Sequence, residues 1–319
     1  MQRIRWANLI VLLGISLLAA CNSSPSPLRK VGSLNTGTAY RVFVQGETAY
    51  VATNDGVVVI DIHDRSRPKK TALIPLKSAA FGVFASGNWV YIAGPADGLV
   101  IADVTDKTSP RVVGTYAGGG INEVCAAGKT AYASTQAGDL LIISVADPAQ
   151  PDLSGTYKAQ GGMGLMVACL QDVVYFSGSN KGLDVVDVSD PTKPVLKMTV
   201  PRTQGAKDTQ IVGSLMYLAC HGNGVRILDI ADPLAPRTIA SFNNGGEAWG
   251  VGGDAKYLWI GDLQEGVELY DASNPRSPVL IAQDPAYAPH DVFFDGQYTY
   301  LADQDQGFII LEAGEELRK

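Results

Sequence analysis

The sequence has few of the residues that bind metals or act as nucleophiles. It contains 3 histidines and 4 cysteines among 319 residues, and neither an H-E-x-x-H nor a G-x-S-x-G motif occurs. His63 lies in an expected turn on one face, and only His221 and His290 fall on the opposite face. We therefore expect no cofactor, no metal and no catalytic residue that a motif identifies.

Positive charge and long apolar segments are also scarce. The chain has 25 Lys and Arg against 32 Asp and Glu, and its net charge of −7 becomes −9 without Arg3 and Arg5. Because basic residues do not cluster, we expect no nucleic acid as a partner. The apolar run from Leu9 to Leu18 is shorter than the roughly 20 residues that a membrane-spanning helix needs.

The first 27 residues have the pattern of an export and anchoring segment. Residues 1–20 combine a basic start, an apolar run and small residues, as in a signal peptide. The sequence LAAC, Leu18 to Cys21, resembles the lipobox of bacterial lipoproteins. This resemblance implies a lipoprotein signal peptide over residues 1–20 and a lipidated Cys21, whose acyl chains, such as palmitate, hold the protein on a membrane. An ordinary signal peptide that contains a cysteine is the alternative.

Residues 21–27 comprise the lipidated Cys21 and a Ser/Pro tether, NSSPSP, which is too polar to pack and too rich in proline to pair as a strand. Asn22 after the cysteine favours the outer membrane or the cell surface over the inner membrane. The expected location is therefore the bacterial cell envelope, with the lipid as anchor.

Seven copies of one short pattern organise residues 28–319. Each copy is an apolar, β-branched run that ends in Asp and leads into a Pro-bounded turn, as in GLDVVDVSDPTKP from Gly182 to Pro194. The copies begin 42, 41, 43, 42, 42 and 41 positions apart, at Gly56, Gly98, Asp139, Gly182, Gly224, Gly266 and Gly307. This period with only strand and turn signals predicts an all-β fold, a seven-bladed β-propeller.

Each repeat has four strand signals, so we expect four-stranded blades. The second strand carries an aromatic residue that we expect to pack between blades: Tyr50, Tyr91, Tyr132, Tyr175, Tyr217, Trp259 and Tyr300. The seventh repeat lacks a fourth strand, while residues 28–34, LRKVGSL, match fourth strands such as RVVGTY. We predict that this N-terminal strand closes the last blade beside Gly307 to Glu312, which removes the open sheet edges.

The repeated aspartates invite a catalytic or calcium-binding interpretation. One group ends third strands (Asp61, Asp103, Asp187, Asp229, Asp271) and another starts turns (Asp64, Asp106, Asp147, Asp190, Asp232, with Asn274). Short carboxylates accept hydrogen bonds from turn N–H groups, and function rarely needs the same group on every blade. We interpret these residues as structural.

A ligand is expected where the repeats differ, at the mouth of the central channel. Eight residues before each aromatic lies a valine column: Val42, Val83, Val124, Val167, Thr209, Val251 and Val292. One step earlier are Arg41, Gly82, Glu123, Met166, Asp208, Gly250 and Asp291, and two steps earlier are Tyr40, Phe81, Asn122, Leu165, Lys207, Trp249 and His290.

From these two rows we select the candidate site for a polar ligand: Arg41, Glu123, Lys207, Asp208, Trp249, His290 and Asp291. A channel rim with internal ion pairs is the alternative. Besides Cys21, the chain has Cys125, Cys169 and Cys220, for which buried free thiols fit better than a disulfide, although Cys125 and Cys169 fall on adjacent blades.

The sequences GLVIADVTD, GLDVVDVSDP and GVRILDIADP resemble the LVIVD repeat family of bacterial and archaeal envelope proteins, over nearly all of residues 28–312. The resemblance implies a seven-bladed propeller and supplies no common catalytic residues. We expect a lipid-anchored binding or scaffold module for a protein or glycan partner rather than an enzyme. The alternative is a periplasmic or surface hydrolase or lyase that uses His290 and Asp291 as acid and base beside Arg41.

Overall fold

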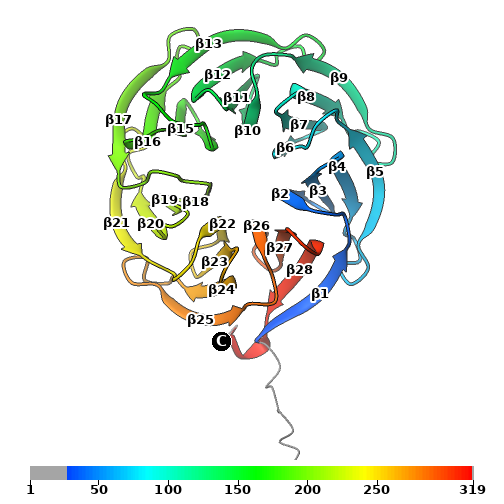
Figure 1. The fold of residues 1–319 in the computed structure, drawn as a ribbon, viewed down its shortest axis with the longest axis vertical. Helices are drawn as coiled ribbons and strands as arrows, with labels where there is room; N and C mark the ends of the chain where they lie inside the picture. The colour runs from blue at the N-terminus through cyan, green and yellow to red at the C-terminus, as the bar shows by residue number, and fades with distance from the viewer. Residues whose placement is uncertain (1–26, 318–319) are drawn as a thin grey trace, which may run out of the picture.

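The computed structural model describes residues 27–317, which form a ring of seven four-stranded antiparallel sheets around a central channel (Figure 1). The predicted seven-bladed β-propeller is therefore confirmed. The predicted signal peptide, the lipidated Cys21 and residues 22–26 of the tether lie outside the described residues. Within residues 27–317, no helix has the length and hydropathy that crossing a bilayer requires.

The blades repeat one meander from the channel to the perimeter. The innermost strands are β2 (Ala39–Gln45), β6 (Gly82–Ser86), β10 (Ile121–Ala127), β14 (Met166–Leu170), β18 (Asp208–Val212), β22 (Ala248–Gly253) and β26 (Pro289–Phe294). The second strands are β3 (Thr48–Thr53), β7 (Trp89–Gly94), β11 (Thr130–Thr135), β15 (Val173–Ser179), β19 (Leu215–Ala219), β23 (Tyr257–Asp262) and β27 (Thr299–Asp303).

The outer half of each blade follows the same order. The third strands are β4 (Gly56–Asp61), β8 (Gly98–Asp103), β12 (Asp139–Ser144), β16 (Gly182–Asp187), β20 (Val225–Asp229), β24 (Gly266–Asp271) and β28 (Gly307–Ala313). The outermost strands are β5 (Lys69–Pro75), β9 (Arg111–Tyr116), β13 (Asp152–Lys158), β17 (Val195–Pro201), β21 (Arg237–Phe242), β25 (Val279–Asp284) and β1 (Leu28–Leu34). A 3₁₀ turn, η1 (Glu315–Leu317), follows β28.

The hydrophobic core lies between neighbouring blades. The second and third strands are apolar on both faces because each face packs against another blade, and β4 is buried along all but its last residue. All seven members of the aromatic column are at most 5% exposed. Tyr50, for example, packs in one cluster with Val83 and Ile92 of the next blade. The prediction that this column is interblade core is confirmed.

Each outermost strand contains a β-bulge at the same position. In all seven blades the register between third and fourth strands shifts by one residue, for example between Ile142 and Ile143 of β12 where they face β13. A bulge bends a strand and increases its twist. The repeated bulge therefore curves the outermost strands along the perimeter of the ring.

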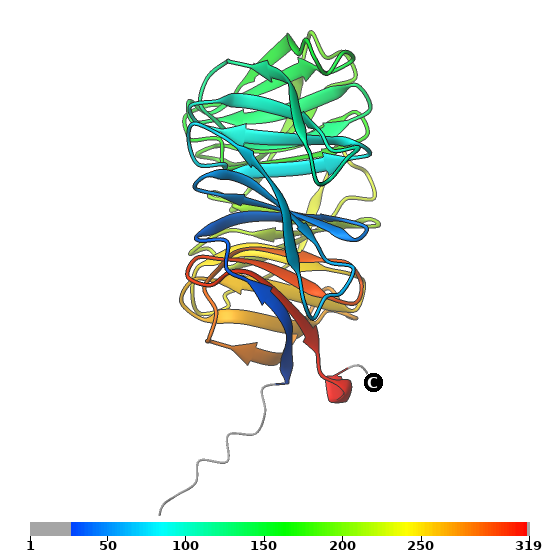
Figure 2. The same cartoon turned by 90° about the vertical axis from the view of Figure 1, so that its right-hand side faces the viewer.

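The N-terminal strand completes the last blade, as predicted. β1 pairs antiparallel with β28, with Leu28 opposite Ala313 and Leu34 opposite Phe308, and the two strands lie side by side at one edge of the ring (Figure 2). Gly32 lies so close to blade 1 that a Cβ there would stand 2.2 Å from the carbonyl oxygen of Arg65. This glycine allows β1 to contact the first blade as well as the last.

The repeated aspartates are structural, as interpreted. In the turns, Asp190 Oδ1 accepts hydrogen bonds from the backbone N–H of Thr192 at 3.0 Å and from its hydroxyl at 2.7 Å. At the strand ends, Asp187 Oδ1 accepts from the N–H of Ser189 at 3.0 Å. The same contacts, with the neighbour two residues on, recur at Asp61, Asp103, Asp229, Asp271, Asp64, Asp106, Asp147, Asp232 and Asn274.

Candidate functional site

The residues two positions before the valine column reach the channel mouth in one of two backbone arrangements. In four blades the residue is the extra residue of a β-bulge in the innermost strand: Tyr40, Asn122, Trp249 and His290. In the other three blades it precedes the innermost strand: Phe81, Leu165 and Lys207. A bulge redirects a side chain that strict alternation would send to the opposite face. All seven residues therefore line one cavity at the mouth.

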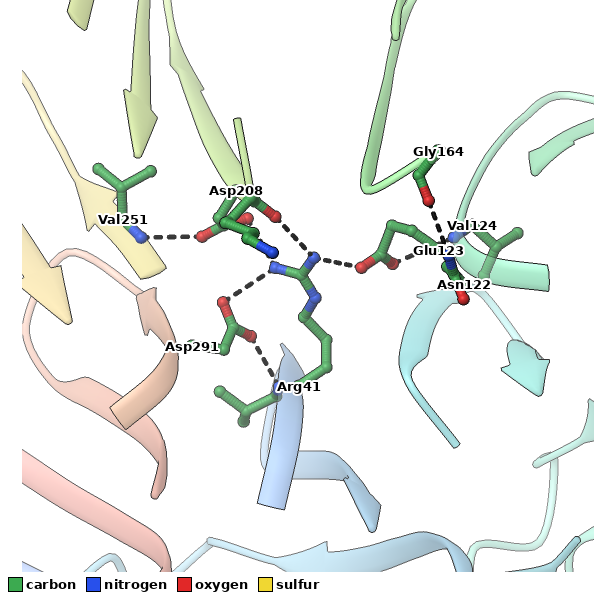
Figure 3. Close-up of polar contacts among 10 residues, drawn as sticks. Arg41, Asn122, Glu123, Val124, Gly164, Asp208, Val251 and Asp291 are labelled. Atoms are coloured by element: carbon green, nitrogen blue, oxygen red, sulfur yellow. Dashed lines mark hydrogen bonds and ion pairs between the residues drawn. The ribbon is translucent and has the colours of Figure 1, made fainter. Parts of the chain in front are cut away.

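Beneath the mouth, one arginine is held by three carboxylates from alternate blades (Figure 3). Arg41 of β2 pairs with Asp208 Oδ1 of β18 at 2.7 Å, with Asp291 Oδ1 of β26 at 3.1 Å and with Glu123 of β10. The remaining carboxylate oxygens accept from the backbone. Asp291 Oδ2 accepts from the N–H of Val42, Asp208 Oδ2 from that of Val251, both at 2.8 Å.

We call these four residues, Arg41, Glu123, Asp208 and Asp291, the Arg41 cluster. Glycines make room for it: a Cβ at Gly82 would stand 2.6 Å from Glu123 Oε1, and one at Gly250 would stand 2.7 Å from the Asp291 Cα. The variable row one step before the valine column thus alternates bulky charged residues with residues that lack charge. Three of the four side chains are tied to a neighbouring innermost strand or to their own backbone, so the cluster braces the ring from inside.

The cluster holds three acids against one base, and burial shifts their pKa values. Burial raises the pKa of Asp208 to about 8, because Arg41 offsets only part of the desolvation and Asp291 adds repulsion. Burial also raises the pKa of Glu123, against the attraction of Arg41. For Arg41, burial alone would lower the pKa, but Glu123, Asp291 and Asp208 together raise it. Burial and Asp291 thus oppose ionisation of Asp208, whereas Arg41 and the N–H of Val251 favour it.

The Arg41 cluster separates two cavities in the central channel. The mouth cavity has a volume of about 310 Å³, and Arg41 and Glu123 form part of its lining. The channel cavity has a volume of about 320 Å³ and is lined by the Arg41 cluster together with apolar residues of the innermost strands, including Phe43, Phe84 and Phe293. Cys125 and Cys169 also line it, and both are free thiols.

Five rings from five blades form a continuous arc at the channel mouth, and all of them except His221 line the mouth cavity. Their centroids follow one another in the order Phe81, Tyr40, His290, Trp249 and His221, at separations of 5.3, 5.5, 5.5 and 5.5 Å. These separations are those of favourable edge-to-face and tilted ring pairs. We call these residues the aromatic arc. The exposed Met163 and the half-buried Leu165 complete the apolar lining on the other side.

Lys207 provides a positive charge at the wall of the mouth cavity. Its ammonium nitrogen lies 4.4 Å from the ring centroid of Trp249, a cation–π contact. Burial lowers the pKa of Lys207, and Glu247 is the one charge that raises it. Within residues 27–317 Lys207 forms no ion pair with a carboxylate, because Glu247 pairs with His221 Nε2 at 3.2 Å. The indole N–H of Trp249 is buried without a hydrogen-bond partner.

The structure divides the candidate site into two groups. Lys207, Trp249 and His290 lie in the mouth cavity, whereas Asp208 and Asp291 line only the channel cavity. Arg41 and Glu123 lie between the two cavities, and the ion pairs of the cluster match the alternative of an internally paired rim, except that the groups are buried. Whether any of these residues binds a ligand stays a prediction.

His290 and Asp291, the acid and base of the hydrolase alternative, do not share a cavity. His290 Nδ1 donates to the carbonyl of Ala39 at 3.0 Å, and Asp291 is hydrogen-bonded to Arg41 and to the N–H of Val42. Of the residues that line the mouth cavity, Tyr40, Phe81, Asn122 and Leu165 were in the variable row but were not selected, and Met163 lay outside that row. The neighbouring His221 and Glu247 were not selected either. Met163 and Glu247 lie in the variable loops between fourth and first strands, a signal that points to the mouth but not to individual residues.

The closed ring of seven four-stranded blades defines a β-propeller. The LVIVD repeat model matches residues 36–71, 79–117, 118–159, 161–201, 205–244, 245–283 and 289–312. The chain therefore belongs to the LVIVD repeat family. A comparison with curated protein sequences gives no match.

Solved structures share the fold at low identity. The β-propeller domain of Cps50 (Swd1) from Myceliophteria thermophila is 11% identical, with 90% of this chain and 99% of that chain covered and a TM-score of 0.72. U3-55K is 11% identical, with 89% and 98% covered and a TM-score of 0.68. The designed protein Ika8 is 9% identical, with 89% and 99% covered and a TM-score of 0.65. These likenesses show the fold alone.

Proposed function

We propose that this protein is a lipid-anchored binding module of the bacterial cell envelope, and that its mouth cavity receives part of a partner molecule. The observation that carries the proposal is the mouth cavity itself, an apolar hollow of about 310 Å³ lined by an aromatic arc. Solvent-exposed apolar side chains gathered in one concave place mark an interaction site. β-Propellers commonly mediate protein interactions, which favours a protein over a glycan as the partner.

The distribution of polar groups supports binding rather than turnover. The carboxylates of the Arg41 cluster already accept hydrogen bonds from the Arg41 guanidinium and from backbone N–H groups. His290 uses Nδ1 on a backbone carbonyl. General acid–base catalysis requires two such groups within reach of one bond, whereas His290 lines the mouth cavity and Asp291 lines the channel cavity. We therefore favour a binding role.

The test is site-specific photo-crosslinking in intact cells. A photoreactive phenylalanine analogue replaces Phe81 or Met163, which are 36% and 53% exposed at the mouth, and Val279, which is 59% exposed on β25 at the perimeter, serves as the matched control. We expect a discrete crosslinked protein from the two mouth positions and none from Val279. Crosslinks that form only at Val279, or at no position, contradict the proposal.

The anchor is tested separately with Cys21→Ser. We expect the variant to lose incorporation of labelled palmitate and to move from the membrane fraction to the soluble fraction, because acyl chains on Cys21 supply the membrane affinity. Cys220→Ser is the matched control and is expected to stay with the membrane. A Cys21→Ser variant that remains membrane-bound and labelled contradicts the lipid anchor.

A further inference from the structure

We propose that the mouth cavity binds the C-terminal residue of a partner polypeptide, with its apolar side chain against the aromatic arc and its free carboxylate beside Lys207. This inference rests on the proposed function and assigns it a ligand chemistry. It follows from the floor, the size and the charge of the cavity.

The floor of the mouth cavity restricts what can enter. Arg41 and Glu123 line both cavities and so lie between them, and the ion pairs of the Arg41 cluster reach across the channel at this level (Figure 3). An extended chain that ran on to the far face would have to break these ion pairs. A chain end meets no such constraint. The volume of about 310 Å³ is near the lower limit of small-ligand sites, ~300–1,000 Å³, and suits a single bulky residue.

The wall requires an apolar group. Phe81, Tyr40, His290 and Trp249 present ring faces and edges to the cavity, and Leu165 and Met163 lie on the other side. The Tyr40 hydroxyl donates to Asn54 Oδ1 at 2.8 Å, so its polar end is already satisfied. A buried aromatic or aliphatic side chain in such a hollow is the usual anchor of a protein interface.

The charge at the wall selects an anion. Lys207 is held over Trp249 with its charge partly desolvated and with no carboxylate of residues 27–317 paired to it. Glu247 raises the pKa of Lys207 and lies 3.2 Å from His221 Nε2, but burial lowers the pKa of Lys207 more strongly, so the positive charge is only partly compensated. An incoming carboxylate supplies the missing partner, and a charge-assisted hydrogen bond in a partly desolvated site is strong.

The same groups disfavour a neutral sugar. Sugar hydroxyls are donors as well as acceptors, and they need acceptors on the protein. The carboxylates of the Arg41 cluster already accept hydrogen bonds within the protein, while the ammonium group of Lys207 is a donor at the wall. A ligand that brings acceptors and an apolar body fits better.

The experiment measures binding of short peptides to the full-length protein by calorimetry. The probe is Gly-Ser-Gly-Ser-Phe with a free C-terminus, compared with the same peptide amidated, with a peptide ending in Ala, and with N-acetylphenylalanine. We expect the free acid to bind about 10-fold or more tightly than the amide, because one contact to a charged group is lost. We also expect the Ala peptide and N-acetylphenylalanine to bind more weakly than the Phe peptide.

Two variants assign the preference to Lys207. Lys207→Met keeps the apolar stem and is expected to bring the acid-to-amide ratio to about one, whereas Lys207→Arg is expected to retain it. Lys256→Met is the matched control, since Lys256 also lies over a ring, that of Tyr257 at 4.9 Å, in the turn between β22 and β23. Its ratio is expected to be unchanged.

Several outcomes overturn the inference. If the free acid and the amide bind equally, or if Lys207→Met leaves the acid-to-amide affinity ratio unchanged, the cavity does not recognise a terminal carboxylate. The mouth then remains a binding site of other specificity. Equal affinity of N-acetylphenylalanine and the peptide assigns the cavity to a small carboxylate instead of a chain end. Tighter binding of phenethylamine than of the acid assigns it to a cation. If no probe binds, the inference fails, and the crosslinking experiment still decides the proposed function.

Discussion

At the scale of single residues, Arg41 compensates the buried negative charge inside the channel. It is 14% exposed and faces three carboxylates, two of which bind the N–H of a valine in the next blade. Removing one partner of a buried ion pair leaves uncompensated charge and typically costs about 3–5 kcal/mol. We expect Arg41→Met to reduce the free energy of unfolding in urea by about this amount.

Arg111→Met is the control for this prediction. Arg111 also pairs with an aspartate, Asp103 at 3.2 Å, but its side chain is 74% exposed. Exposed ion pairs contribute little, because water and salt screen them. We expect no measurable shift of its urea midpoint. If both arginine variants unfold at the same midpoint as the unchanged protein, the cluster does not brace the ring.

Asp208 makes stability depend on pH in an unusual direction. Its pKa is about 8 in the folded protein, against 3.8 for an ordinary aspartate, so the folded state keeps a proton that the unfolded chain releases between these values. Stability from this group is therefore present below about pH 4 and falls as the pH rises to about 8, with a slope of at most ~1.4 kcal/mol per pH unit.

Asp208→Asn removes this titration. We expect the variant to have a flatter dependence of the urea midpoint on pH between 4 and 8 than the unchanged protein. Asp172→Asn, an exposed aspartate in the turn between β14 and β15, is the control and is expected to leave the pH dependence as it is. Identical curves for Asp208→Asn and the unchanged protein contradict a protonated Asp208.

At the level of the element, the strand β1 depends on the absence of a side chain at Gly32. A Cβ there would approach the Arg65 carbonyl oxygen at 2.2 Å and Pro68 at 3.0 Å. Overpacking of this kind costs about 1–3 kcal/mol. We expect Gly32→Val to lower the free energy of unfolding by that amount. Ser33→Val, one residue later on the exposed side of β1, is expected to stay within ~0.5 kcal/mol.

The bulges explain how far sequence reasoning reached into the site. The period and the aromatic column identified every blade, because each blade must bury the same apolar faces. Counting two residues back from the valine column identified the residues at the mouth. In a regular strand, however, consecutive side chains point to opposite faces, so Tyr40 and Arg41 would not both face the channel. The bulges that allow this are marked by no residue type: the extra residues are Tyr, Asn, Trp and His.

The Arg41 cluster was beyond sequence reasoning for a different reason. Arg41, Glu123, Asp208 and Asp291 come from β2, β10, β18 and β26, separated by as many as 250 residues, and meet only across the channel. Their residue types suggested ion pairs, yet which charges meet depends on the diameter of the ring. The diameter of the ring also determines how deeply these side chains are buried and how far the pKa of Asp208 is raised. No local sequence pattern predicts that diameter.

At the scale of the whole molecule, β1 covers the outer edge of β28 and so completes the last blade. Deleting Leu28 to Leu34 uncovers the edge of β28, whose residues are all buried in the closed ring. Exposed strand edges pair with other chains. We expect the deletion variant to form oligomers in size-exclusion chromatography with light scattering. Deletion of residues 22–26 is the control and is expected to change neither the number of subunits nor the stability. If the protein without residues 28–34 remains monomeric, the role of β1 is contradicted.

The pairing of Leu28 with Ala313 also sets the order of events during synthesis. A ribosome produces the first partner of this pair at the beginning of translation and the second near its end, so the nascent polypeptide has to wait with an unpaired leading strand. Contacts between residues so distant in sequence form slowly, because the intervening chain loses much entropy when they meet. A chain cut short anywhere before blade seven cannot form this closing pair, and its open end stays accessible to proteases.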